Sequence, residues 1–171
     1  LGLEFELRQN FDKLNASLKN FSFLMNFTYI KSQIEMGSAE YNSRVENARK
    51  GEIIEKYRDM AGQAPFLINA GLSYEGSEKG FWNNVEAGLY YNVQGQTLQY
   101  VGIVDRPSVY TKPFHSLNFN ASKGFGAEGK LQIGLKIDNI LDSERETVYK
   151  SYNAKDQLFS KLKPGSTFQL K

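Results

Sequence analysis

The chain of 171 residues contains no cysteine and one histidine, His115. Disulfides and thiolate metal sites are therefore excluded, and a single imidazole cannot form a histidine cluster. No run of about 18 apolar residues occurs, which excludes a membrane-spanning helix but not membrane-spanning strands, whose hydropathy signal is much weaker. The formal net charge of +2 does not indicate nucleic acid as a partner. We predict no cofactor, no metal site and no nucleic-acid partner for a chain long enough to form one domain.

What the sequence does contain is a regular alternation of apolar and polar residues. In residues 131–138 every odd position is Leu or Ile, and the even positions are Gln, Gly, Lys and Asp. A period of two predicts a β-strand with one apolar and one polar face. Residues 115–125 alternate in the same way, and a glycine-rich turn at 126–130 joins the two strands. The same pattern predicts further strands at 1–8, 21–30, 66–75, 84–92 and 164–171.

The connections between these strands are alternately short and long. The short turns are 12–20, 76–80 and 126–130, and the long connections are 35–64, 94–113 and 153–163. Consecutive connections of an up-and-down sheet lie at opposite ends, so the long connections should share one end. We expect a short helix at about 45–57. We also expect residues 144–152 to continue the strand 131–138 beyond a bulge at 139–142.

Alternation alone does not say what covers the apolar face. A second sheet covers it in a soluble sandwich, whereas lipid covers it in a membrane barrel and the polar face lines a wet lumen. Charged residues on the polar faces, such as Glu86 and Lys136, favour the barrel, as do segments of about 10 residues, which can cross a bilayer when tilted. Aromatic residues toward the strand ends are typical of interfacial girdles: Tyr29, Tyr74, Phe81, Tyr91 and Phe125.

The predicted fold class is therefore all-β, as an antiparallel up-and-down transmembrane β-barrel. In this fold Ile133 and Leu135 face lipid, and Gln132 and Lys136 face the lumen. Seven strands or so leave two unpaired edges, and in lipid each unpaired backbone group costs several kcal/mol. The missing strands must come from the rest of the polypeptide or from another chain. The alternative that stays open is a soluble β-sandwich acting as a binding or adhesin module.

Several short motifs have structural explanations. The GxGxxG pattern at 124–129 is followed by a strand and not by the helix that a nucleotide site needs, so its glycines fit a turn. The carboxylates on the polar strand faces are scattered and have no partner histidine. We therefore predict no catalytic residue and no enzyme activity. Tyr90, Tyr100 and Tyr110 suit stacking on a ligand, but packing explains them equally well.

Five segments carry a family resemblance. Residues 58–74 read Arg-Asp-Met-Ala-Gly-Gln-Ala-Pro and then Phe-Leu-Ile-Asn-Ala-Gly-Leu-Ser-Tyr; 89–92 read Leu-Tyr-Tyr-Asn, 100–102 Tyr-Val-Gly, 139–142 Asn-Ile-Leu-Asp and 164–170 Pro-Gly-Ser-Thr-Phe-Gln-Leu. In order and spacing they resemble the C-terminal barrel region of TonB-dependent outer-membrane receptors, and residues 1–34 are compatible with it. Two features depart from the family: its last strand usually ends on an aromatic residue, whereas Lys171 stands here, and the plug is absent.

The resemblance implies a 22-stranded barrel in the bacterial outer membrane with an N-terminal plug, and energised uptake of a nutrient ligand such as a siderophore, a glycan or a peptide. The implied partners are the lipid bilayer, the remainder of the barrel and plug, and a TonB-type inner-membrane transducer reached through the N-terminal part. A surface lipoprotein is a further candidate. Because Leu1 already lies in a strand pattern, we expect residues 1–171 to be the last seven strands or so of a longer receptor. Segments 35–64 and 94–113 are the candidate ligand-binding loops, with no individual residue assigned.

Overall fold

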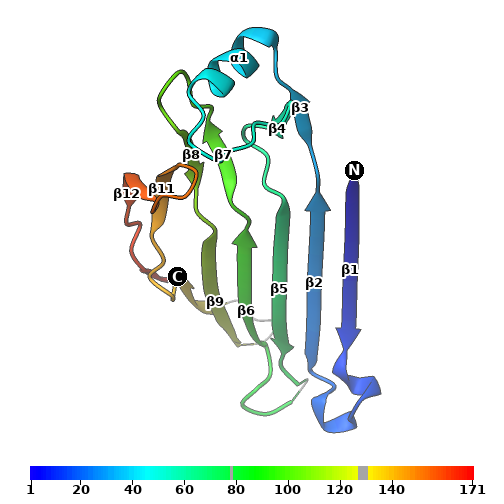
Figure 1. The fold of residues 1–171 in the computed structure, drawn as a ribbon. Coiled ribbons are helices and arrows are strands. Elements are labelled where there is room, and N and C mark those ends of the chain that lie inside the picture. Colours follow the sequence, from blue (N-terminus) through cyan, green and yellow to red (C-terminus); the bar gives the residue numbers. More distant parts are fainter. Residues whose placement is uncertain (78, 127–130) are drawn as a thin grey trace.

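A computed structural model describes residues 1–77, 79–126 and 131–171. The described chain is all-β apart from one α-helix and two short 3₁₀ turns (Figure 1). The strands are β1 (Gly2–Asn10), β2 (Phe21–Ile30), β3 (Gln33–Glu35), β4 (Tyr57–Asp59), β5 (Phe66–Glu75), β6 (Val85–Gln94), β7 (Thr97–Tyr100), β8 (Ser108–Thr111), β9 (Phe114–Phe125), β10 (Leu131–Asp138), β11 (Arg145–Lys150), β12 (Gln157–Leu162) and β13 (Thr167–Leu170). The helix is α1 (Ser38–Glu46), and the 3₁₀ turns are Phe11–Lys13 and Ala16–Leu18.

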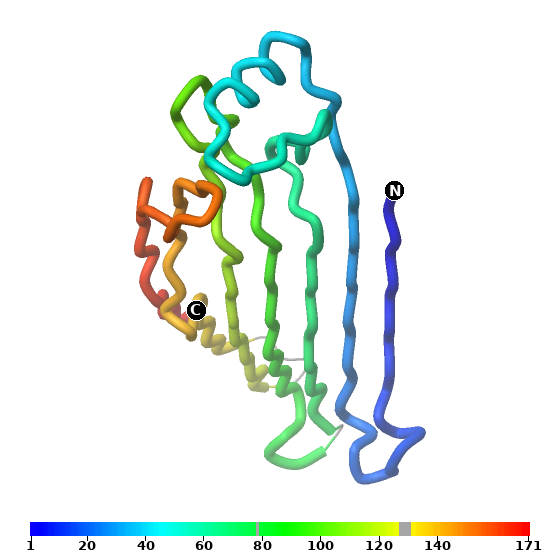
Figure 2. Tube along the Cα trace, in the orientation of Figure 1, coloured from blue at the N-terminus to red at the C-terminus, as the bar shows by residue number. Residues whose placement is uncertain are grey.

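Seven strands form one open antiparallel sheet in the order β1-β2-β5-β6-β9-β10-β13. This order follows the chain, so the seven predicted main strands and their up-and-down arrangement are confirmed. The two termini lie at opposite edges of the sheet, where β1 and β13 each have a neighbour on one side only (Figure 2). The described residues therefore form an open sheet and not a closed barrel.

The strand register collects the apolar side chains on one face. One cross-strand row of that face consists of Phe5, Phe27, Ile68, Val93 and His115. The adjacent row, which points to the other face, consists of Glu6, Asn26, Asn69, Asn92 and Ser116. Because the side-chain period is two, the shared register extends this division over the whole sheet.

The apolar face is not buried within the described chain. Phe5, Leu72 and Leu89 on this face are 51%, 40% and 40% exposed, and Phe168 on β13 is 70% exposed. The buried apolar side chains lie mostly outside this face, among them Leu98, Val109 and Val148 of a second sheet. The seven-stranded sheet thus has no packed hydrophobic core of its own.

The long connections all lie at one end of the sheet, as predicted, and they carry most of the additional structure. The connection between β2 and β5 holds β3, α1 and β4, and that between β6 and β9 holds β7 and β8 (Figure 1). The turns between β1 and β2 and between β5 and β6 lie at the other end. We call these two ends the long-connection end and the short-turn end. Residues 127–130 of the predicted 126–130 turn, and residue 78 of the 76–80 turn, lie outside the described residues.

A second, four-stranded sheet has the order β12-β11-β8-β7 and extends the main sheet at the long-connection end, because β7 and β8 pair in the same register as β6 and β9. The Arg145 guanidinium of β11 stacks 4.6 Å from the ring centroid of Phe114, whose neighbour across the strands is Gln94 of the polar face. A hollow of about 690 Å³ lies on the polar side where the two sheets meet, and it is lined by Asn92 and Ser116 of the main sheet and by Thr147 of β11. The four-stranded sheet therefore continues the main sheet lengthwise and does not form a second layer over it.

The helix lies elsewhere than predicted, whereas residues 144–152 contain the predicted continuation of the strand 131–138. The helix occupies Ser38–Glu46 and not 45–57, because it begins directly after Gly37 and its last turn is closed by Asn47, whose side-chain amide donates to the Ser43 carbonyl. The prediction that residues 144–152 continue the strand beyond a bulge is confirmed for β11, which follows β10 after a break and pairs with β8, the segment that leads into β9. The break contains Asn139 and Asp142, which both have positive φ.

Asn139 ties this turn to the rest of the sheet. Its side-chain amide donates to the carbonyls of Ser143 and Gly165 at 3.2 and 3.1 Å, and its side-chain oxygen accepts from the Ser143 N–H. Its backbone N–H donates to the Asn118 side chain of β9, and its carbonyl accepts from the Ser166 hydroxyl. Asn139 is nearly buried, with 7% of its surface exposed, and it connects the segments that enter β10 and β13. A short polar side chain that tolerates positive φ explains the Asn of the 139–142 motif.

Replacing Asn139 with Ala should destabilise the folded protein by about 1–3 kcal/mol, because three hydrogen bonds are lost and buried carbonyls stay unsatisfied. The midpoint of urea unfolding, followed by fluorescence of Trp82, measures the change. Asn153→Ala is the matched control, since Asn153 also has positive φ but is exposed. If both variants unfold at the same urea concentration, the hydrogen bonds of Asn139 contribute nothing measurable.

Candidate functional site

The two candidate ligand-binding segments are brought together at the long-connection end. Arg44 of α1 donates from Nη2 to the Ser108 hydroxyl of β8 at 3.4 Å, and the Gly62 N–H donates to the Leu98 carbonyl of β7 at 2.8 Å. The third connection joins them, because the Tyr152 side chain approaches Gly51. A single surface is therefore formed by segments 35–64, 94–113 and 139–166. The binding of a ligand to this surface stays a prediction.

A hollow of about 410 Å³ opens between these segments. Its wall includes charged residues from all three connections: Arg44, Arg49, Glu52, Asp59, Asp105, Arg106 and Lys150. Tyr110 and Tyr152 add aromatic surface. The spacing of these residues along the sequence gave no periodic signal, so only the folded connections could show that they meet.

Tyr110 lies in the wall of this hollow. Burial raises the pKa of the Tyr110 phenol above its ordinary value, and the nearby Asp59 charge raises it further, against the smaller opposing effects of Arg44 and Arg58. The Lys150 ammonium lies 5.9 Å from the centroid of the Tyr110 ring. The phenol is therefore uncharged at neutral pH. It can donate a hydrogen bond, but it does not act as a base.

The other tyrosines considered as stacking residues have structural partners. The Tyr90 ring lies across Gly71 and Gly88 on the polar face, where an added Cβ would come within 2.9 and 2.4 Å of the ring. Tyr100 packs against Phe159 of β12 with ring centroids 5.8 Å apart. Packing accounts for Tyr90 and Tyr100. Of the three tyrosines considered as stacking residues, Tyr110 is the one that lines the hollow of about 410 Å³.

An ion-pair network holds the second sheet together. Glu146 of β11 pairs with Lys112 at 3.0 Å and with Lys161 of β12 at 3.4 Å, and Lys161 also pairs with Glu144. The hydrogen bond and charge of Lys112 lower the pKa of the Glu146 carboxyl, and Lys161 adds to this. The hydrogen bond from Lys161 to Glu144 raises the pKa of the Lys161 ammonium.

No comparison with known proteins gave a match, whether against protein-family models, curated proteins or solved structures. The resemblance to TonB-dependent receptors therefore stays a prediction. Within residues 1–77, 79–126 and 131–171, no group of three metal-ligating side chains comes together. No helix in the part of the chain that the structure describes is long and apolar enough to cross a membrane.

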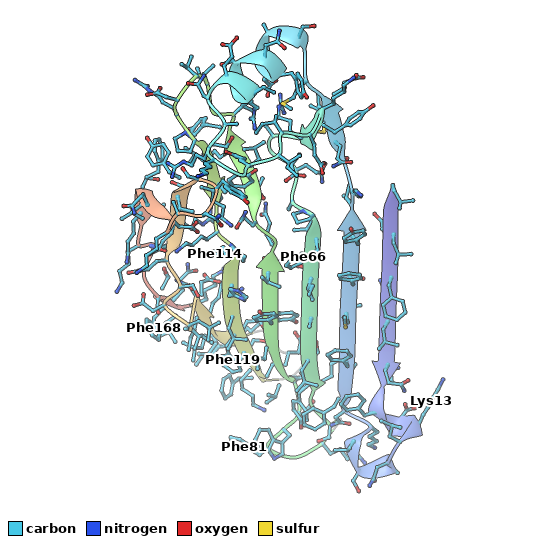
Figure 3. The ribbon with its side chains drawn as sticks, viewed as in Figure 1. Lys13, Phe66, Phe81, Phe114, Phe119 and Phe168 are labelled. Carbon is cyan, nitrogen blue, oxygen red and sulfur yellow. The ribbon has the colours of Figure 1, made fainter. Side chains whose placement is uncertain are left out.

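The aromatic residues predicted to mark strand ends lie at two levels. At the short-turn end, Tyr74 packs between Phe21 and Trp82 with ring centroids 5.0 and 6.1 Å away, and Phe81 contacts Trp82. Phe81 appears there in Figure 3, well separated from Phe66 and Phe114 near the other end of the strands. Nearer the long-connection end, the Tyr91 hydroxyl lies 2.6 Å from Nδ1 of His115.

The ion pairs of Glu146 predict a pH dependence of the second sheet. The folded pKa of Glu146 is lowered, so its stabilising contribution is present at neutral pH and is lost as the pH falls through that lowered pKa. The folded pKa of Lys161 is raised, so its contribution is lost only as the pH rises through a value above its ordinary one. A nitroxide attached at Leu158→Cys on β12 should therefore become more mobile in acid. Electron paramagnetic resonance spectra measure this.

Glu146→Gln should make the same nitroxide more mobile at pH 7 and should weaken the acid response. Glu75→Gln at the short-turn end, which removes one carboxylate far from β12, is the control and should leave the spectrum unchanged. An acid response of full size in Glu146→Gln would show that other groups control the second sheet.

Proposed function

We propose that residues 1–171 form part of a transmembrane β-barrel of the bacterial outer membrane, a receptor that takes up a ligand with energy from a TonB-type partner. The observation that carries the membrane part is the continuous, exposed apolar face of the seven-stranded sheet. A contiguous apolar surface of this extent marks an interface with lipid or with another protein. The family resemblance supports the receptor part.

The dimensions of the apolar band support a lipid cover. On β9 the apolar-face residues between His115 and Lys123 are Leu117, Phe119 and Ala121. Eight residues of strand rise about 27 Å, and a tilt of roughly 40° reduces the height to about 20 Å, near the ≈ 25 Å apolar band of outer-membrane barrels. On β2 aromatic residues bound an equally long band, from Phe21 to Tyr29. Interfacial aromatic residues sit at such levels in membrane barrels.

The polar face supports a hydrated lumen. A hollow of about 510 Å³ lies over β5, β6, β9 and β10, and Glu75, Glu86 and Lys136 line it. The side chains of Asn69 and Asn92 hydrogen-bond to each other on this face. Amides, hydroxyls and charges of both signs suit contact with water or with a plug in the lumen.

The soluble sandwich is the weaker alternative. A sandwich needs a second sheet over the apolar face. The four-stranded sheet of the described chain extends the main sheet lengthwise and leaves most of the apolar face exposed. Lipid or a separate protein must then cover the apolar face.

Two leucines on opposite faces at the same height test the facing. Leu72→Arg should reduce assembly of the protein in outer membranes, because an arginine facing lipid near the bilayer midplane costs about 2–4 kcal/mol. Leu24→Arg should cost little, because Leu24 belongs to the polar-face row with Arg8 and Gly71. The amount of heat-modifiable folded protein in outer-membrane fractions measures assembly.

Leu72→Phe separates lipid from a protein cover. Lipid accommodates the larger side chain with little change, whereas a packed sandwich core loses about 1–3 kcal/mol through overpacking. Ala70→Ser, on the same face, is the polar comparison. Under a lipid cover or a protein cover, it should destabilise the protein more than Leu72→Phe does under a lipid cover. Strong destabilisation by Leu72→Phe, together with purification in the absence of detergent, would contradict the barrel.

Epitope tags test the orientation of the two ends. Tags inserted after Asn47 and after Lys155 should bind antibody on intact cells, because both positions belong to exposed segments at the long-connection end. A tag after Lys13, at the short-turn end, should bind only after the cells are opened (Figure 3). Antibody binding to the Lys13 tag on unbroken cells would reverse the orientation.

A further inference from the structure

Three cations from three separate connections line a second hollow beside the one described above. Arg49 follows α1, Arg106 lies in the turn between β7 and β8, and Lys155 lies in the turn between β11 and β12. The hollow has a volume of about 430 Å³ and shares Arg49 and Arg106 with its neighbour. Asp105 is the one carboxylate in its wall.

None of these three cations forms an ion pair within the described residues. Nearby, Arg58 pairs with Glu40 and Lys112 pairs with Glu146. Three cations against one carboxylate give the wall of this hollow an excess of positive charge, which favours the binding of an anion.

The wall also supplies neutral polar and aromatic groups. Ser151 contributes a hydroxyl and Gln157 an amide, and Tyr149 forms an aromatic side that is braced edge-on by Phe159, with ring centroids 5.2 Å apart. Two guanidinium groups offer planar pairs of N–H donors, which match the oxygen atoms of a carboxylate or a phosphate.

We propose that this hollow, defined by Arg49, Arg106 and Lys155, binds the oxyanion group, carboxylate or phosphate, of a soluble ligand that carries at least two negative charges. This inference rests on the proposed function in one respect, namely that the bound ligand is the ligand that the receptor transports. Binding itself requires no more than the folded long-connection end.

The test is calorimetric titration of the purified protein in detergent with pyrophosphate and with citrate, at constant ionic strength set by NaCl. Either anion should bind, and the tighter of the two identifies the phosphate or the carboxylate class. Maltotriose, a neutral ligand, should give no signal. Arg49→Gln with Arg106→Gln should weaken anion binding by roughly tenfold or more, since hydrogen bonds to charged groups are lost. Asp105→Asn should tighten it, because a repelling charge is removed.

Lys13→Gln with Lys19→Gln is the matched control, because it removes the same two positive charges at the short-turn end. It should leave the affinity unchanged. The proposal is overturned if neither anion binds the unmodified protein, if the double arginine variant binds as tightly as the unmodified protein, or if the lysine control loses as much affinity.

The two proposals fail separately. A protein that needs detergent but binds neither anion retains the barrel and loses the anion site. A protein that purifies without detergent loses the barrel, and the same titration without detergent still decides whether the arginines bind anions.

Discussion

The apolar face of the seven-stranded sheet is the constraint on which the rest of the structure depends. Seven strands in one register place their apolar side chains on one side, and the described chain leaves most of that face exposed. At about 25 cal/mol for each Å² of apolar surface, leaving such a face in water has a large free-energy cost. A cover from outside is therefore required, and the height of the band, its aromatic borders and the polarity of the opposite face all favour lipid.

The backbone imposes a second requirement of the same kind. β1 and β13 each have one edge without a partner in the described residues. In lipid, unpaired edges are so unfavourable that only closed barrels persist. A lipid cover thus implies further strands between β13 and β1, which agrees with the proposal that the chain is part of a larger barrel. In water the same edges would promote association with other chains.

The long-connection end is stabilised differently from the sheet. It contains the buried apolar residues Leu98, Val109 and Val148, and its strands are linked by ion pairs such as Lys112–Glu146. These contacts make a folded surface out of three connections that are far apart in sequence. Within the described residues, no ion pair on that surface involves Arg49, Arg106 or Lys155. These three cations are therefore available to a ligand, unlike the residues that hold the surface together.

The sequence by itself determined the strands, their order and their two faces, because a period of two is local and a one-residue slip would reverse every side chain. It also determined that the long connections share one end, since this follows from up-and-down order. It did not determine the helix at Ser38–Glu46 or the second sheet. Polar connections have no periodicity, and the pairings of β11 with β8 and β12 join segments that no local pattern relates. The meeting of Arg49, Arg106 and Lys155 was likewise decided only by the tertiary structure, because each lies in a different connection and no local pattern relates them.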